Sequence, residues 1–261
     1  MISFAAITPH PPIIIPGIGQ EDDLRLVADT IASMQKLGGE LEAVNPDLLV
    51  IISPHAPLEP YSFGINRQRH LEGSFSDFGL DRSFRLDNDL QVVDRIMFAG
   101  KNNDEDVPVH TFESHLDHGA LVPLFYLARN IQPAVVHLSF SFMSLERHFN
   151  YGEIIGRILE QDPRKVAIIA SGDLSHRLTK NAPAGYSPRG AEFDHELISM
   201  LSNNFIGNIL GLKPAFTDEV GECGLRSIVM SLGMLKHKKY SFSLLSYESP
   251  FGVGYLTARL L

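Results

Sequence analysis

Imidazole and carboxylate side chains recur at the points where apolar stretches of this sequence end. His10 follows MISFAAI, and His55 follows DLLVII. Asp173 and His176 follow a third stretch of the same kind, KVAIIAS. Imidazole and carboxylate groups are common protein ligands of transition metals, so this repetition predicts one metal site assembled from separate loops.

Two further stretches carry ligand-capable groups just ahead of helical patterns. ESHLDHG contains Asp117 and His118, and GECG contains Glu222 and Cys223. A helix N-terminus favours negative groups and lowers the pKa of a thiol, which is the expectation for Cys223. These stretches add candidate ligands and candidate acid–base groups to the predicted site.

Two imidazoles and one carboxylate on one face of a metal form the ligand set of non-haem Fe(II) oxygenases, which leaves positions open for substrate and dioxygen. A further histidine such as His176 can act as acid or base, because the pKa of imidazole lies near neutrality. Diol substrates need such a group if they lose a proton on binding. These residue types therefore predict oxidation of a substrate by dioxygen at a metal.

Each candidate also has a local interpretation. His10 beside proline can be a turn residue, and Asp117 and Asp173 can cap the helices or turns that follow them. Glu222 can be a first-turn helix carboxylate without a metal role. The sequence contains neither C-x-x-C nor H-E-x-x-H, so spacing alone does not identify a metal site.

The elements that must position these residues follow from the apolar periodicity. Strands are predicted at 1–7, 47–53, 61–67, 134–141 and 165–171, and in the segment 240–260. Helices are predicted at about 20–43, 86–100, 118–130, 145–161, 189–204 and 222–236. This alternation favours a single α/β domain over residues 1–261, with a mainly parallel central sheet flanked by helices. Ligands of such sheets bind beyond the carboxyl ends of the strands, where the candidates lie.

The composition narrows the class of protein. The 261 residues have 44% hydrophobic content and a net charge of −9 without a basic stripe, which argues against a nucleic-acid partner. One cysteine excludes an intramolecular disulfide and, with no visible signal peptide, favours a cytoplasmic protein. Apolar runs are shorter than the roughly 18 residues that suggest a membrane helix, so no membrane association is expected.

Seven stretches in order resemble the class III extradiol ring-cleavage dioxygenase superfamily, typified by the catalytic B subunit of protocatechuate 4,5-dioxygenase. They are TPHPPIIIPGIG, SPHAP, DHGALVPL, SGDLSHR, YSPRGAEFD, ECGLRS and FGVGYL. Within the superfamily, the sequence is most similar to the B component of the AmmeMemoRadiSam system and to Memo proteins. The resemblance extends from about residue 4 to 257.

The resemblance implies a non-haem Fe(II) bound by His10 and His55, with Glu222 as third ligand. In Memo-like relatives the matching residue is a cysteine, which would be Cys223. A carboxylate suits oxygenase iron better than a soft thiolate, whereas ligation by Cys223 would indicate copper or zinc. Register alone leaves both residues open.

The resemblance also assigns supporting roles. His176 matches the acid–base histidine, and His118 matches a histidine that orients substrate or lies behind the ligands. Asp173 is expected to orient His176 or a metal ligand, as carboxylates behind metal sites do.

The first functional hypothesis is a ring-cleavage dioxygenase that acts with dioxygen on a small catechol- or aminophenol-type aromatic substrate. The alternatives are a Memo-like metal-binding protein without dioxygenase activity, and a zinc hydrolase or lyase in the same pocket. A homodimer is expected by resemblance only.

Overall fold

The computed structural model describes residues 1–101 and 107–261. The strands are β1 (Ile2–Thr8), β2 (Leu48–Ile52), β3 (Phe63–Asn66), β4 (His70–Ser74), β5 (Ser83–Asp87), β6 (Val109–Phe112), β7 (Ala134–Ser139), β8 (Val166–Ser171), β9 (Ser243–Glu248) and β10 (Tyr255–Arg259). The α-helices are α1 (Glu21–Leu26), α2 (Ala28–Val44), α3 (Leu90–Lys101), α4 (His118–Leu127), α5 (Leu145–Glu160), α6 (Gly190–Ser202), α7 (Ile206–Leu210), α8 (Pro214–Val220) and α9 (Leu225–Met234).

One large sheet organises the molecule, with the strand order β6-β3-β7-β2-β8-β1-β10-β9. Its four central strands, β7, β2, β8 and β1, run parallel to one another. The flanking strands β3 and β10 are antiparallel to β7 and β1, respectively. Every residue of β2 and β8 is buried, as expected for parallel strands that are covered on both faces. The prediction of an α/β domain with a mainly parallel sheet is confirmed.

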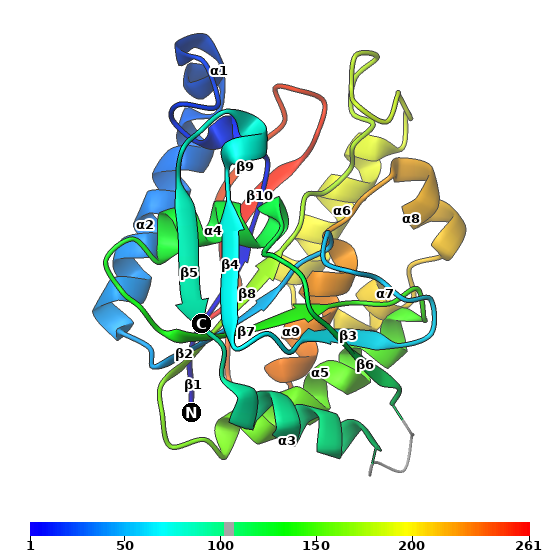
Figure 1. Cartoon of the computed structure of the whole chain (residues 1–261). Helices are drawn as coiled ribbons and strands as arrows, with labels where there is room; N and C mark the ends of the chain where they lie inside the picture. The colour runs from blue at the N-terminus through cyan, green and yellow to red at the C-terminus, as the bar shows by residue number, and fades with distance from the viewer. Residues whose placement is uncertain (102–106) are drawn as a thin grey trace.

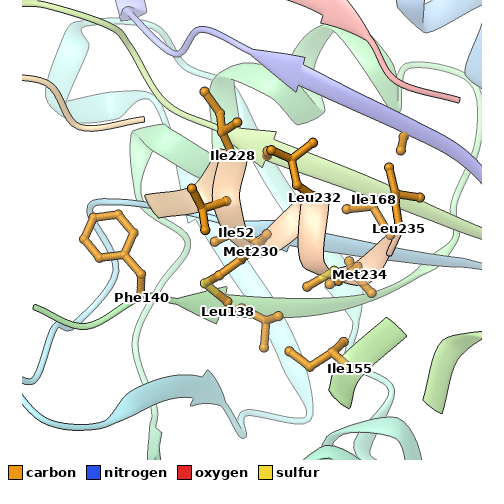
Figure 2. Close-up of a cluster of buried hydrophobic side chains, with 14 of the residues drawn as sticks. Ile52, Leu138, Phe140, Ile155, Ile168, Ile228, Met230, Leu232, Met234 and Leu235 are labelled. Carbon is orange, nitrogen blue, oxygen red and sulfur yellow. The ribbon is translucent and has the colours of Figure 1, made fainter. Parts of the chain in front are cut away.

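Helices cover both faces of this sheet. Figure 1 shows α2 and α4 on one side and α3, α5 and α9 on the other. On the α5–α9 side, alternate side chains of the central strands meet the apolar faces of the two helices. Figure 2 shows this cluster, which includes Ile52, Leu138, Ile155, Ile168, Ile228, Leu232 and Leu235. Burial of each such side chain contributes about 1.5–3 kcal/mol, so this packing holds the carboxyl ends of the strands in place.

Several elements differ from the pattern expected from sequence. The helix predicted at 20–43 is interrupted at Val27, whose φ of −120° and ψ of 28° lie outside the helical region. A separate hairpin, β4–β5, precedes α3. In β4, Leu71 and Gly73 are buried, and β5 alternates between exposed and partly buried residues. Each strand has only five residues, so this alternation is too short to predict the hairpin. None of the described helices has the length and apolar character needed to cross a membrane.

Two adjacent glycines in α2 make a testable pair. A Cβ atom on Gly38 would lie 2.4 Å from the carbonyl oxygen of Tyr126 in α4, whereas one on Gly39 would meet no described heavy atom within 4 Å. We expect Gly39→Ala to raise the free energy of unfolding by about 0.5–1 kcal/mol, because alanine favours helix. Gly38→Ala should lower it by about 1–3 kcal/mol, because the added methyl forces the two helices apart. Chemical denaturation measures both changes, and a stabilising Gly38→Ala would contradict this close packing.

Candidate metal centre

His10 lies just beyond the carboxyl end of β1, and it is only 2% exposed. Prolines on either side of it restrict the backbone to an extended path. Its backbone N–H donates a hydrogen bond of 3.0 Å to Oδ1 of Asp173, which follows β8. Because β1 and β8 are neighbouring parallel strands, their loops leave the sheet side by side. The β8 loop thus holds His10 in position.

A chain of hydrogen bonds selects one tautomer of the His10 ring. Pro123 in α4 has no N–H, so the carbonyl of Gly119 lacks its usual helical donor. The Ser171 hydroxyl donates to that carbonyl at 2.5 Å, and its oxygen therefore accepts from Nδ1–H of His10 at 3.1 Å. Burial lowers the pKa of His10 well below its ordinary value, so the ring is neutral. Nε2 is then left unprotonated and able to bind a metal.

His55, after β2, brings a second imidazole to the same point. Its Nε2 lies 3.0 Å from Nε2 of His10, and the two rings are nearly perpendicular, at 87°. Burial, together with the neighbouring His118, lowers the pKa of His55 to about 4. At neutral pH this ring is also in the uncharged form that binds metals.

His118, the first residue of α4, stacks against His55. The ring centroids are 4.1 Å apart, and the interplanar angle is 29°. Its centroid lies 5.5 Å from that of His10. The structure therefore places His118 beside the two candidate ligands.

Cys223 completes the cluster from the segment before α9. Its Sγ lies 3.7 Å from Nε2 of His10. The backbone N–H groups of Cys223 and Gly224 both donate to the carbonyl of Asp173, at 3.2 and 2.9 Å. Among the described residues, His10, His55 and Cys223 form a group whose ligand atoms all lie within 4.8 Å of one another. Contrary to the expectation for a helix start, burial raises the pKa of the Cys223 thiol, so metal binding must displace its proton.

Glu222 precedes Cys223 but serves a different purpose. Its Oε2 accepts a hydrogen bond of 2.6 Å from the backbone N–H of Leu225, and its Oε1 lies 3.5 Å from Nη1 of Arg226. The side chain is 2% exposed, and burial raises its pKa. Glu222 lies ahead of α9, whose first turn contains no acidic residue, and its carboxylate accepts from the first N–H of that helix. The geometry favours Cys223 over Glu222 as the third ligand.

Asp173 and His176 both lie in the loop after β8. Asp173 bonds the backbone of His10, and its Oδ2 lies 3.9 Å from Nε2 of that ring. Asp173 therefore contacts a candidate metal ligand, and burial raises its pKa to about 7. Nδ1 of His176 lies 3.0 Å from the carbonyl of Leu174, and the ring also hydrogen-bonds the backbone of Gly221. It lies near enough to His10 and His55 for their charges to interact.

The converging donor set can hold a transition metal. Two neutral imidazoles and one thiolate suit zinc or copper. They can also hold iron, which accepts thiolate ligands in haem and iron–sulfur proteins. His55 is the exposed member of the group and His10 the buried one, so the centre is open on one side.

Sequence reasoning missed the residues that support this group. The sequence offers Asp117 both as a ligand-capable group and as a helix cap, and it gives no signal for a site role of Ser53, His137 or Ser171. In the structure, Ser53 donates to Oδ1 of Asp117 at 2.5 Å, and Nε2 of His137 lies 3.4 Å from its Oδ2. Burial would raise the pKa of Asp117, but His137 and Ser53 outweigh it and hold that pKa below the usual range. The motif DHG was the available signal, since it places Asp117 beside His118.

Residues 4–258 match the model of a family described as the catalytic LigB subunit of aromatic ring-opening dioxygenase. Protein CA_C1420 of Clostridium acetobutylicum is 29% identical over 265 residues, which cover 97% of this chain and 56% of that protein. The chain thus spans little more than half the length of that relative. 3,4-Dihydroxyphenylacetate 2,3-dioxygenase of Escherichia coli is 25% identical over 210 residues, covering 74% of this chain and 75% of the enzyme.

Among solved structures, the uncharacterized protein JW3007 from Escherichia coli K12 superposes with a TM-score of 0.70. The alignment covers 99% of both chains at 17% sequence identity. At this identity the similarity establishes a shared fold.

Proposed function

Because the chain belongs to the family of catalytic LigB subunits of aromatic ring-opening dioxygenases, we propose that it is a metal-dependent extradiol dioxygenase of catechol- or aminophenol-type substrates. One observation supports this most strongly. His10, His55 and Cys223 converge at the carboxyl edge of the sheet, with His118 stacked on His55 and with His176 near enough for its charge to act on both histidines. A metal group flanked by two further imidazoles is what deprotonation of a diol at a metal requires.

The contacts of each site residue indicate its role in the proposed reaction. His10 and His55 present unprotonated nitrogens, and Cys223 supplies a negative ligand after loss of its proton. A bound Fe(II) would supply the open coordination positions at which substrate and dioxygen meet. His176, whose charge acts on His10 and His55, is the imidazole that accepts a proton from a substrate hydroxyl. His118, stacked on His55, offers a ring edge that orients the substrate.

The test is oxygen uptake by the protein loaded anaerobically with Fe(II). The substrate panel contains catechol, 3,4-dihydroxyphenylacetate and 2-aminophenol. We expect uptake with at least one of them, and a loss of about 10²–10⁴-fold in His176→Ala with unchanged iron content. His237→Ala is the matched control, because His237 pairs with Glu153 beyond the other end of α9. The proposal fails if no substrate supports uptake, or if His176→Ala keeps the wild-type rate.

A second candidate is the Memo-like metal-binding protein without dioxygenase activity. The position of Cys223 favours it, because a thiolate is a softer ligand than the carboxylate of oxygenase iron. Elemental mass spectrometry of protein purified without added metal distinguishes the two. Near-stoichiometric iron supports the dioxygenase, whereas copper or zinc together with no oxygen uptake supports the Memo-like function.

A further inference from the structure

Asp117 stands at the N-cap position of α4, yet within the described residues its carboxylate makes no capping hydrogen bond. It binds instead to Ser53 at 2.5 Å and lies 3.4 Å from His137. The side chain of His137 is 0% exposed and that of Asp117 is 14% exposed. A carboxylate withdrawn from water in this way costs free energy, which interactions around it must offset.

The contacts of Asp117 lead directly to His55. The Ser53 oxygen that bonds Asp117 also accepts the backbone N–H of His55 at 3.3 Å. Ser53, Asp117 and His55 all lie close to the Cα atom of Gly119, which carries no side chain. A Cβ there would lie 2.4 Å from Oγ of Ser53, 2.8 Å from Oδ1 of Asp117 and 3.3 Å from Cδ2 of His55. The carbonyl of Gly119 belongs to the hydrogen-bond chain that selects the His10 tautomer, so the start of α4 supports both histidines.

His137 lies against the carboxylate of Asp117. Oδ1 of Asn66 accepts from the backbone N–H of Gln68 at 3.0 Å, so the Asn66 amide nitrogen faces the carbonyl of Ser114 at 2.8 Å and Nδ1 of His137 at 3.4 Å. Nδ1 of His137 is then an acceptor, and its Nε2 lies 3.4 Å from Oδ2 of Asp117, although among the described residues neither atom completes a hydrogen bond. His137 therefore contacts the carboxylate of Asp117 and covers it from water.

The charge of Asp117 acts on the centre. Its electrostatic interaction reaches the rings of His10, His55 and His118. Two neutral imidazoles and one thiolate leave a net charge of +1 on a bound divalent cation. We propose that Asp117 is a positioning residue of the metal centre, which fixes His55 through Ser53 and supplies the second negative charge that balances the metal. This inference rests on the proposed metal-dependent function.

The test is a titration of metal-free, full-length protein with Co(II), followed by the absorbance of the thiolate-to-cobalt charge-transfer band. Asp117→Asn keeps the size of the side chain and removes its charge. We expect Asp117→Asn to weaken Co(II) binding by roughly 10–100-fold, which is the usual loss of metal affinity when a residue that orients a metal ligand is mutated. The thermal midpoint of each metal-free variant is measured as well, because a purely structural role would lower the midpoint and leave the affinity unchanged.

Asp162→Asn is the matched control. The side chain of Asp162 is 4% exposed and pairs with Arg164 ahead of β8, at the opposite end of that strand from the centre. Asp162→Asn should lower the thermal midpoint of the metal-free protein without changing its affinity for Co(II). The inference is overturned if Asp117→Asn binds Co(II) like the wild type, or if Asp162→Asn weakens binding equally.

Ser53→Ala and His137→Gln each remove one contact of the carboxylate, and they replace Asp117→Asn if that variant does not fold. Both should weaken Co(II) binding, and unchanged affinity in both overturns the inference. A wild-type protein that binds no Co(II) overturns the metal centre and this inference together. If the wild type binds Co(II) and the variants bind it with the same affinity, only the role of Asp117 is overturned.

Discussion

Cys223→Ser should lower the affinity of the protein for a divalent metal by more than about 100-fold, which corresponds to about 2.8 kcal/mol. The Sγ of Cys223 lies 3.7 Å from Nε2 of His10, in the group that converges with His55. Serine has nearly the same shape, but its hydroxyl does not ionise near neutral pH and is a poor metal ligand. Loss of a direct ligand should exceed the roughly 10–100-fold effect of changes behind the ligands.

Glu222→Gln is the decisive comparison. Glutamine keeps an oxygen that can accept from the backbone N–H of Leu225, so the start of α9 is preserved. We expect metal affinity within about threefold of the wild type, or less than about 0.7 kcal/mol. Titration calorimetry with Zn(II) and elemental analysis after dialysis measure both variants. The opposite result, with metal lost in Glu222→Gln and kept in Cys223→Ser, would assign the third ligand to the carboxylate.

Gly172→Ala should lower the free energy of unfolding by about 3 kcal/mol, at the upper end of the usual cost of overpacking. A Cβ atom on Gly172 would lie 2.1 Å from Cα of Gly224 and 3.0 Å from its backbone nitrogen. Both are backbone atoms, so no flexible side chain can move aside. The loop after β8 and the start of α9 must separate, which carries Cys223 away from His10 and weakens metal binding as well.

Gly207→Ala in α7 provides the control, because a Cβ there would meet no described heavy atom within 4 Å. It should leave metal affinity unchanged and stabilise the fold by up to about 1 kcal/mol. Urea denaturation and Zn(II) titration on the two variants test the prediction. Gly172→Ala with wild-type stability and affinity would show that the crossing of the two loops is not tight.

The central strands and the helices that cover them could be predicted from local sequence patterns. Continuous apolar runs such as 47–53 and 165–171 suit strands that are buried on both faces, and β2 and β8 have this environment. Helical periodicity predicted α5 and α9 in the same way. The β4–β5 hairpin was missed because each strand has only five residues, which is too short for its alternation of apolar and polar residues to stand out.

The neighbourhood of His10, His55 and the loop of Asp173 also followed from sequence. Each lies after an apolar run, and parallel neighbouring strands bring their carboxyl ends to one edge of the sheet. Two imidazoles and the Asp173 carboxylate at one place could thus be expected before any coordinates existed. Their hydrogen-bond partners could not, because Ser171, Gly119 and Pro123 meet only through the packing of α4 against the sheet.

Only the tertiary structure distinguishes Cys223 from Glu222 as the candidate third metal ligand. The two residues are adjacent, and a rotation of the backbone there exchanges which side chain faces the histidines. The carbonyl of Asp173 and the contact of Gly172 with Gly224 set that rotation, across about 50 residues of sequence. The role of Asp117 was decided in the same way, because a cap and a buried partner of Ser53 and His137 have the same local sequence. Sequence determined which groups gather at the sheet edge, and the crossing of loops distant in the chain determined which of them meet.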